Sequence, residues 1–349
     1  MKFKFIFFFL GLIWVGLCMA FMNNVENHLT PLSTKEKLSE YGFFQGDLKL
    51  QIPSKGVVPY EINMPLFTDY AYKKRYFVLP VGEKVAFNPD SVLQFPVGTV
   101  LIKTFYYPID ERNLTLGNRM IETRLLIHDK NKGWDALTYI WNEDQSDAIL
   151  EIAGDTKSVS WTDISGKKNT IDYAIPNRNQ CKGCHNKYEK MEPIGPSARQ
   201  LNKTVSIEKS KIHQLNYFKE IGLLSGDIEL EKIPFFGDWE TADLDKKARA
   251  YLDINCAHCH NKNGPASTSG LFLEYHQTDS TAFGFNKAPV AAGKGSGNLK
   301  YDIVKGKPKE SILLYRMQSL DPGVMMPELG RTIHHKEGIQ LIKDWIAKM

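Results

Sequence analysis

The chain has 349 residues, a net charge of +4, and 42% hydrophobic and 24% charged residues. These values are typical of a globular protein with a large core, and the length favours two or three domains. The basic residues are not clustered as a nucleic-acid-binding surface requires, so we expect no nucleic-acid partner.

Residues 1–22 have the pattern of a secretory signal peptide. A basic start precedes an uncharged apolar stretch, residues 5–22, and small residues around Ala20 suit cleavage before Phe21. Two alternatives stay open: an uncleaved membrane anchor, since the stretch is just long enough to span a bilayer, and lipidation of Cys18. We therefore predict an exported, periplasmic protein, associated with the membrane if the segment is retained.

Residues 23–175 are predicted to form a strand-rich antiparallel β domain. Runs such as SVLQFPVGTVLIKTFYYPI (91–109), RMIETRLLIHD (119–129) and WDALTYIW (134–141) are rich in β-branched and aromatic residues. Gly, Pro and Asp separate these runs, as expected for strands joined by turns. We assign the aromatic residues of this domain to its core.

The pattern Cys-x-x-Cys-His occurs twice, as CKGCH at residues 181–185 and as CAHCH at residues 256–260. The two copies contain every cysteine except Cys18. The first copy lies in a segment, residues 176–235, that follows the predicted strands directly. Gly, Pro and several Asn precede it, so no helix is expected upstream of Cys181.

Three chemistries use paired cysteines at this spacing. A thioredoxin-like dithiol and a four-cysteine zinc site need no adjacent histidine. In haem c attachment, two thiols bond to the haem vinyl groups and the following histidine is the proximal iron ligand. Only this chemistry explains both histidines, and it agrees with export, because haem c is attached outside the cytoplasm. We predict two covalent haem c groups, held by Cys181, Cys184, His185, Cys256, Cys259 and His260.

The sixth ligand of the first haem iron is an open question in the sequence. SIEKSKIHQLNYFKEIGLL (206–224) has apolar residues at helical spacing, and His213 on this predicted helix is one candidate ligand. Met191 is a second candidate. Met64, Met120 and His128 are candidates from the β domain, and an open coordination position is a further alternative.

The second motif lies in residues 236–349, where two helices are predicted. One begins at Thr241 or Asp243 as the cap and runs to the motif, and the other is HKEGIQLIKDWIAKM (335–349) at the end of the chain. Gly264-Pro265 follows the motif closely.

A methionine pair precedes the last helix, in SLDPGVMMPELG (319–330). A loop thioether on the face opposite the histidine is a known sixth haem ligand and raises the reduction potential. Met326, directly before Pro327, is the predicted ligand of the second haem, and Met325 is the second choice. The alternative is a methionine that only fills a gap in the core.

A helix before the motif, a Gly-Pro after it and a terminal helix with an aromatic residue resemble the cytochrome c fold over residues 241–349. This resemblance implies that the two helices cross and that the Pro265 carbonyl supports His260. With PNRNQCKGCHN, GPSARQLN and ARAYLDINCAHCHN, the chain resembles, over residues 60–349, a family of exported dihaem c-type cytochromes of poorly defined role. The expected fold class is α+β, with an antiparallel β domain followed by a mainly α-helical cytochrome c-type region.

These patterns favour an electron carrier between redox partner proteins, whose identity they do not give, rather than an enzyme. The alternative is a dihaem peroxidase-like oxidoreductase, in which the His/Met second haem supplies electrons to an open first haem. That enzyme needs an acid or base over the open face, and Glu189, Glu192 and His213 are the nearest candidates in sequence. A third alternative is a redox sensor that uses the β domain for docking.

Overall fold

The computed structural model describes residues 33–207, 209–230, 233 and 242–349. The predicted targeting segment and Thr241 lie outside the described residues. Residues 34–349 form one compact unit, and the predicted boundaries at 175 and 235 fall inside it. Among the described residues, no helix has the length and apolar character needed to cross a bilayer.

The elements are, in chain order, η1 (Leu38–Tyr41), β1 (Phe44–Gln45), η2 (Leu48–Leu50), β2 (Ile52–Pro53), β3 (Val57–Pro59), β4 (Tyr72–Val78), β5 (Val85–Ala86), β6 (Val100–Pro108), η3 (Leu114–Leu116), β7 (Asn118–Asp129), β8 (Gly133–Trp141), β9 (Ala148–Glu151), β10 (Asp155–Thr162), β11 (Lys168–Ile175), α2 (Arg178–Cys184), β12 (Asn186–Lys187), β13 (Lys190–Met191), α3 (Ala198–Leu201), β14 (Thr204–Ile207), β15 (Ser210–His213), α4 (Gln214–Glu220), β16 (Leu224–Ser225), α5 (Leu244–Asn255), η5 (Ser267–Ser269), η6 (Gly293–Ser296), η7 (Pro308–Glu310), α6 (Ile312–Met317) and α7 (Lys336–Lys348).

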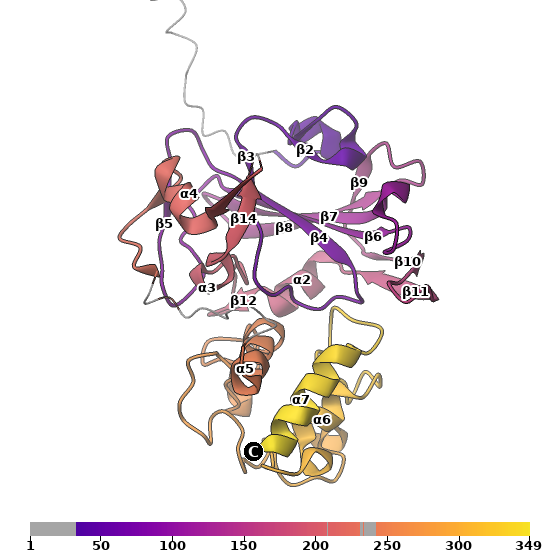
Figure 1. The fold of residues 1–349 in the computed structure, drawn as a ribbon, viewed down its shortest axis with the longest axis vertical. Coiled ribbons are helices and arrows are strands. Elements are labelled where there is room, and N and C mark those ends of the chain that lie inside the picture. Colours follow the sequence, from indigo (N-terminus) through magenta and orange to yellow (C-terminus); the bar gives the residue numbers. More distant parts are fainter. Residues whose placement is uncertain (1–32, 208, 231–232, 234–241) are drawn as a thin grey trace, which may run out of the picture. The chain divides into compact units, whose positions relative to one another are not determined.

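A six-stranded antiparallel sheet, in the order β3-β4-β6-β7-β8-β9, forms the centre of the N-terminal half (Figure 1). The expected β-rich N-terminal region is therefore present. The register places Arg75 of β4 opposite Lys103 of β6, and Lys103 opposite Arg124 of β7. These three side chains share one face of the sheet, because partners in neighbouring strands point to the same side.

Both faces of this sheet are covered. One face, with Ile102 and Leu125, packs against N-terminal residues such as Leu38. On the other face, Leu101 and Leu126 pack against the segment that contains α2, α3 and α4. A sheet buried on both faces needs apolar residues at successive positions, which explains the nearly continuous apolar run in β6.

The hairpin β10–β11 covers the far end of the same face as Leu101. Its Trp161 and Tyr173 pack with Phe105 and Tyr107 of β6 in a separate apolar cluster. The row Arg75–Lys103–Arg124 therefore crosses the sheet between two apolar regions of one face.

The helix predicted over residues 206–224 is in part wrong. The hairpin β14–β15 occupies its first half, and α4 begins only at Gln214. Lys209 has a φ of 71°, a left-handed conformation that suits a tight turn and cannot continue a helix. His213 ends β15 and is the residue before α4, so it does not lie within a helix.

Helices α5 and α7 confirm the two helices expected in the C-terminal segment. Asp243 caps α5, since its carboxylate accepts a hydrogen bond of 2.8 Å from the Lys246 N–H. The helices pack together where Gly338 of α7 meets Tyr251 of α5. A Cβ at position 338 would lie 2.3 Å from the Tyr251 hydroxyl, so only glycine permits this contact.

The expected mainly α-helical C-terminal region is wrong. Between α5 and α7, the only α-helix in this described part of the chain is the six-residue α6, and turns and irregular segments make up the rest. Glycines interrupt the backbone there, with φ values of 61° at Gly270 and 105° at Gly284, and prolines follow at Pro289 and Pro308. Such residues cannot extend a helix, so most of the residues in this region form loops.

Candidate cofactor-binding cavities

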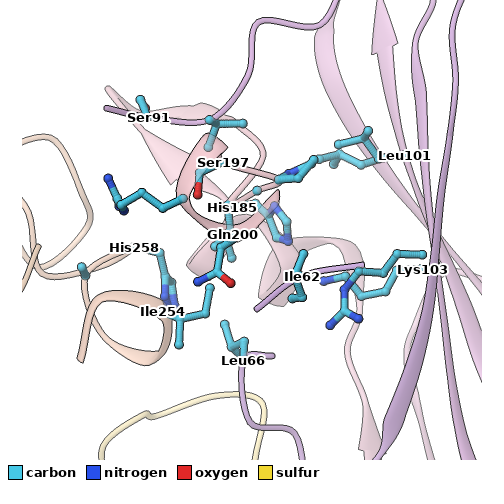
Figure 2. A pocket seen from close by; sticks show the side chains of 18 of the residues that line it. Ile62, Leu66, Ser91, Leu101, Lys103, His185, Ser197, Gln200, Ile254 and His258 are labelled. Atoms are coloured by element: carbon cyan, nitrogen blue, oxygen red, sulfur yellow. The ribbon is translucent and has the colours of Figure 1, made fainter. Parts of the chain in front are cut away.

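Two cavities lie among the described residues, and residues of both Cys-x-x-Cys-His motifs line each of them. Cys181, His185 and His258 line one, and Cys184, Cys256, Cys259 and His260 line the other. The sheet cavity, of about 210 Å³, has Lys103, Cys181, His185 and His258 among its lining residues. Figure 2 shows this cavity, with His185 and His258 on different elements around it. The C-terminal cavity is larger, about 550 Å³, and lies within the range of small-molecule and cofactor sites.

Helix α2 carries the first motif. It begins at Arg178, so the expectation that no helix precedes Cys181 is wrong, because Asn177 caps the helix and does not break it. Asn177 and Gln180 cap its start reciprocally, each side-chain oxygen accepting a backbone N–H at 2.9 Å. The helix places Cys181 one turn before His185, whose N–H donates to the Cys181 carbonyl at 2.9 Å. Cys181 is buried against the sheet, and this burial raises the pKa of its thiol.

The His185 imidazole is held with one nitrogen free. Its Nδ1 lies 3.0 Å from the Glu192 carbonyl oxygen, and a carbonyl only accepts, so Nδ1 carries the hydrogen. Burial, followed by the nearby Lys103 charge, lowers the pKa of His185 to about 3. The ring is therefore neutral near pH 7, and Nε2 has the free electron pair that a metal ligand needs.

His260 lines the C-terminal cavity in a similar state. Ser269 Oγ donates its hydrogen to the Ala266 carbonyl at 2.6 Å, so this oxygen accepts from His260 Nδ1, 3.4 Å away. Burial lowers the pKa of His260 to about 4. The Nε2 atom is again the free ligand, but Ser269, not the Pro265 carbonyl, is the partner of Nδ1.

Gly264 and Pro265 close the loop after the second motif. A Cβ at position 264 would lie 2.4 Å from the Cys259 carbonyl oxygen, so the loop can fold back onto the motif only with glycine there. Pro265 lines the C-terminal cavity together with Cys256, Cys259 and His260.

The methionine loop reaches the same cavity. Met326 lines it, whereas Met325 is buried and does not. The Arg331 guanidinium holds the loop, donating to the carbonyls of Met326 at 3.0 Å and Ser319 at 2.8 Å. The structure thus brings Met326, His260 and both cysteines of the second motif to one cavity, from segments far apart in the sequence.

The two motifs meet at their second cysteines. The sulfur atoms of Cys184 and Cys259 and a ring nitrogen of His258 all lie within 4.8 Å of one another. The hydrogen bond between the two thiols lowers the pKa of Cys184 and raises that of Cys259. Cys181 and Cys256 do not join this group, so the four cysteines do not converge on one point.

The proposed sixth ligands of the first haem lie elsewhere. His213 does not line the sheet cavity, and its Nε2 is 2.9 Å from the Asn202 side-chain oxygen. His128 stacks on Trp134 and bonds to the Phe95 carbonyl. The candidate methionines Met64, Met120 and Met191 pack in three different apolar clusters.

Sequence analysis missed several residues around His185. His258 and His276 line the sheet cavity, as do the three cations Arg75, Lys103 and Arg124. The only sequence signal for His258 was its place inside the second motif, in CAHCH. The cations gave no signal, because strand register alone brings them together.

No family model, curated protein or solved structure matches this chain. The family resemblance of the two motifs therefore stays a prediction.

Proposed function

We propose that the chain binds two covalent haem c groups and transfers electrons between redox partner proteins outside the cytoplasm. The observation that supports this most strongly is the C-terminal cavity, which Cys256, Cys259, His260 and Met326 line together. Attachment thiols, a proximal imidazole and a thioether are the full ligand set of a His/Met haem. No other common cofactor needs this combination.

The chemical state of the residues also fits haem. Both motif histidines are neutral imidazoles whose Nδ1 atoms donate to protein oxygens, which leaves each Nε2 free to bind iron. Each lies on the wall of a cavity with a cysteine of its own motif. Bound haem iron supplies reversible one-electron chemistry, and the protein supplies the ligands and excludes water.

The contact between the motifs supports electron transfer within the molecule. Because the Cys184 and Cys259 sulfurs lie within 4.8 Å, groups attached to them are neighbours. Electrons can then pass between the two cofactors without crossing solvent. This arrangement suits a relay that accepts an electron at one cavity and donates it from the other.

A second candidate is a metal-binding protein. Cys184, Cys259 and His258 have the ligand types and proximity of a zinc site with three protein ligands. This function would explain the close sulfur atoms. It would leave both cavities, His185, His260 and Met326 without a role, so we place it second.

The test is the cofactor content of the full chain, made in a host that attaches haem c to exported proteins. We expect two covalent haems per chain, measured by the pyridine haemochrome spectrum and by the mass of the denatured protein. The variants Cys181→Ser/Cys184→Ser and Cys256→Ser/Cys259→Ser should each lose one haem. Lys182→Ala, at an exposed position between the first two cysteines, is the matched control and should keep both.

The result against this proposal would be no covalent haem together with one bound zinc. Elemental analysis would detect the metal, and zinc should then be lost in Cys184→Ser and in His258→Ala but not in Cys256→Ser. Electron transfer itself is tested by reduction of both haems with a soluble one-electron donor, followed by their reoxidation.

A further inference from the structure

A row of three cations faces the sheet cavity. Arg75, Lys103 and Arg124 lie at paired register positions on β4, β6 and β7, and all three line the cavity. Figure 2 shows Lys103 and His185 at the same cavity. Like charges directly opposite each other on a sheet are destabilising, so this row needs a compensating group.

Within the described residues, the protein supplies only part of that compensation. Glu122, whose side chain is fully buried, forms an ion pair with Arg124 and also accepts a hydrogen bond of 2.7 Å from the Tyr173 hydroxyl. Arg75 donates to the Lys73 carbonyl at 3.2 Å and forms no ion pair. Lys103 has neither a hydrogen bond nor an ion pair to any described residue.

Other contacts do not neutralise the row. Lys103 lies 5.6 Å from the centre of the Phe105 ring and Arg124 lies 4.3 Å from it, and an aromatic ring attracts a cation but carries no net charge. Burial, followed by Arg75 and Arg124, lowers the pKa of Lys103 to about 7. Lys73 Nζ lies 5.6 Å from the centre of the Phe105 ring and donates to the Leu66 and Ala71 carbonyls, and burial lowers its pKa well below the usual value.

The acidic residues of the cavity wall do not pair with the row. Asp253 accepts two hydrogen bonds from Arg199 Nη2, at 2.9 and 3.1 Å. Asp90 and Glu274 line the cavity without an ion pair to any member of the row. The unbalanced positive charge is therefore directed into the cavity.

We propose that Arg75, Lys103 and Arg124 form a binding site for a carboxylate or a similar oxyanion in the sheet cavity. Guanidinium groups bind carboxylates through two parallel hydrogen bonds, and an ammonium group adds a point charge. A cavity of about 210 Å³ next to apolar residues such as Leu101 and Leu126 admits a small anion or the acidic end of a larger group.

Two sources can supply that carboxylate. One is a propionate of a haem attached to the first motif, and the other is a small free anion that reaches the cavity from solution. A free anion beside His185 would be a substrate or a ligand, which favours the oxidoreductase alternative over the simple relay. The site itself does not depend on haem, because it rests on the unbalanced cations.

The first measurement is anion binding to the purified full chain by calorimetry, with sodium acetate and inorganic phosphate as probes. If the source is a free anion, wild-type protein should bind a probe saturably, and Lys103→Met should weaken this at least tenfold. Lys74→Met is the matched control, since Lys74 is on the neighbouring strand β4 and points to the other face, where its Nζ bonds to the Leu50 carbonyl. This control should bind as wild type does.

The second measurement uses the haem-loaded protein and tests whether a haem propionate is the bound carboxylate. If a propionate fills the site, no added anion binds. Lys103→Met should then lower the reduction potential of the first haem and shift the propionate carboxylate band in the infrared spectrum, while Lys74→Met changes neither. Haem content, measured separately, shows whether the cofactor is present.

The proposal is overturned if wild-type protein binds neither probe and Lys103→Met changes neither the potential nor the infrared band. Arg75→Met should have the same effects as Lys103→Met, and the absence of these effects would equally count against the proposal. If the chain proves to carry no haem, the binding measurement alone decides, so failure of the proposed function and failure of the anion site are distinguishable.

Discussion

The two cavities have different walls, although residues of both Cys-x-x-Cys-His motifs line each of them. The sheet cavity is built from long-range strand pairing, and its lining includes the row Arg75, Lys103 and Arg124, in which Lys103 has no hydrogen bond or ion pair to any described residue. The C-terminal cavity is built from loops around α5, α6 and α7, and its lining includes the thioether of Met326. In the proposed function, the motif would decide where a haem is attached, and the surrounding fold would decide which groups lie near its other face.

This difference implies different chemistry at the two positions. A thioether next to His260 favours a stable His/Met site that only exchanges electrons. Cations next to His185 favour negative charge, whether it belongs to a cofactor side group or to a free ligand. The predictions below test this contrast from the largest expected effect to the smallest.

The strongest test of the contrast is removal of the thioether. Met326→Ala should lower the reduction potential of the second haem by roughly 0.1–0.3 V, a fraction of the ~0.8 V range that axial ligands span. It should also allow carbon monoxide to bind the reduced second haem. Spectroscopic redox titration measures the first effect, and Met325→Ala is the matched control. Equal effects of the two substitutions would show that the loop as a whole, and not the Met326 sulfur, sets the reduction potential.

The cation row can be tested through Glu122, the carboxylate that forms an ion pair with Arg124. Glu122→Gln leaves Arg124 without a charge partner in a buried setting, so the free energy of unfolding should fall by about 3–5 kcal/mol. Urea denaturation followed by circular dichroism measures this. Glu143→Gln removes an exposed pair with Arg119 and should cost at most about 1 kcal/mol. A loss below about 1 kcal/mol for Glu122→Gln would mean that the row does not depend on this carboxylate.

A third prediction concerns the connection between the two halves. The Asp69 carboxylate accepts hydrogen bonds from the backbone N–H groups of Thr332 and Ile333 at 2.8–3.0 Å. Asp69→Asn should lower the free energy of unfolding by roughly 1.5–3 kcal/mol, because bonds to a charged acceptor are lost. Thermal and urea unfolding measure the effect. The control is Asp344→Asn, at an exposed position on α7, which should leave the free energy of unfolding unchanged. An unchanged free energy of unfolding in Asp69→Asn would show that these hydrogen bonds do not stabilise the fold.

The smallest effect is a pH dependence at His335, which joins the same halves. This ring stacks on Phe67 at 4.2 Å, and its Nδ1 lies 3.0 Å from the Tyr251 hydroxyl. Burial lowers the pKa of His335 to about 4, so between about pH 6.5 and 4 the unfolded chain holds a proton that the folded chain lacks. Stability should therefore fall as the pH falls through this window, by at most about 1.4 kcal/mol per pH unit.

His335→Gln should reduce the dependence of the free energy of unfolding on pH, measured by urea unfolding at pH 5 and pH 7. The neighbouring His334→Gln is the control and should keep it, since the exposed His334 ring bonds only to the Gln318 carbonyl. Identical slopes in both variants would assign the acid sensitivity to other groups.

Much of the local structure was predictable. Helix α5 follows from the Asp243 cap and its apolar spacing, and α7 from the positions of Ile342, Trp345 and Ile346, all of which are buried. Strands β6, β7 and β8 follow from dense β-branched and aromatic runs. In these segments, local propensity and tertiary packing favour the same structure.

Prediction failed where a sequence pattern suited both a helix and a strand, or where residues far apart in the sequence determined the local structure. The apolar spacing around Ile207 and Ile212 suits a helix, but β14 pairs with β15 there. Val205 of this hairpin is buried, and His213 lies next to Asn202. The cytochrome-like motifs suggested a mainly helical region, yet glycine and proline made most of it loops. A motif shared with a helical family does not by itself imply helices around it.

The sequence by itself determined the two Cys-x-x-Cys-His motifs and the methionine loop, since each is a short pattern of neighbouring residues. Only the tertiary structure decided that Cys184 meets Cys259, that Met326 and not Met325 lines the cavity of His260, and that three cations from separate strands face His185. These contacts depend on strand register and on packing between segments far apart in the chain. No local pattern encodes them, because the energy that selects them comes from burial of the whole core.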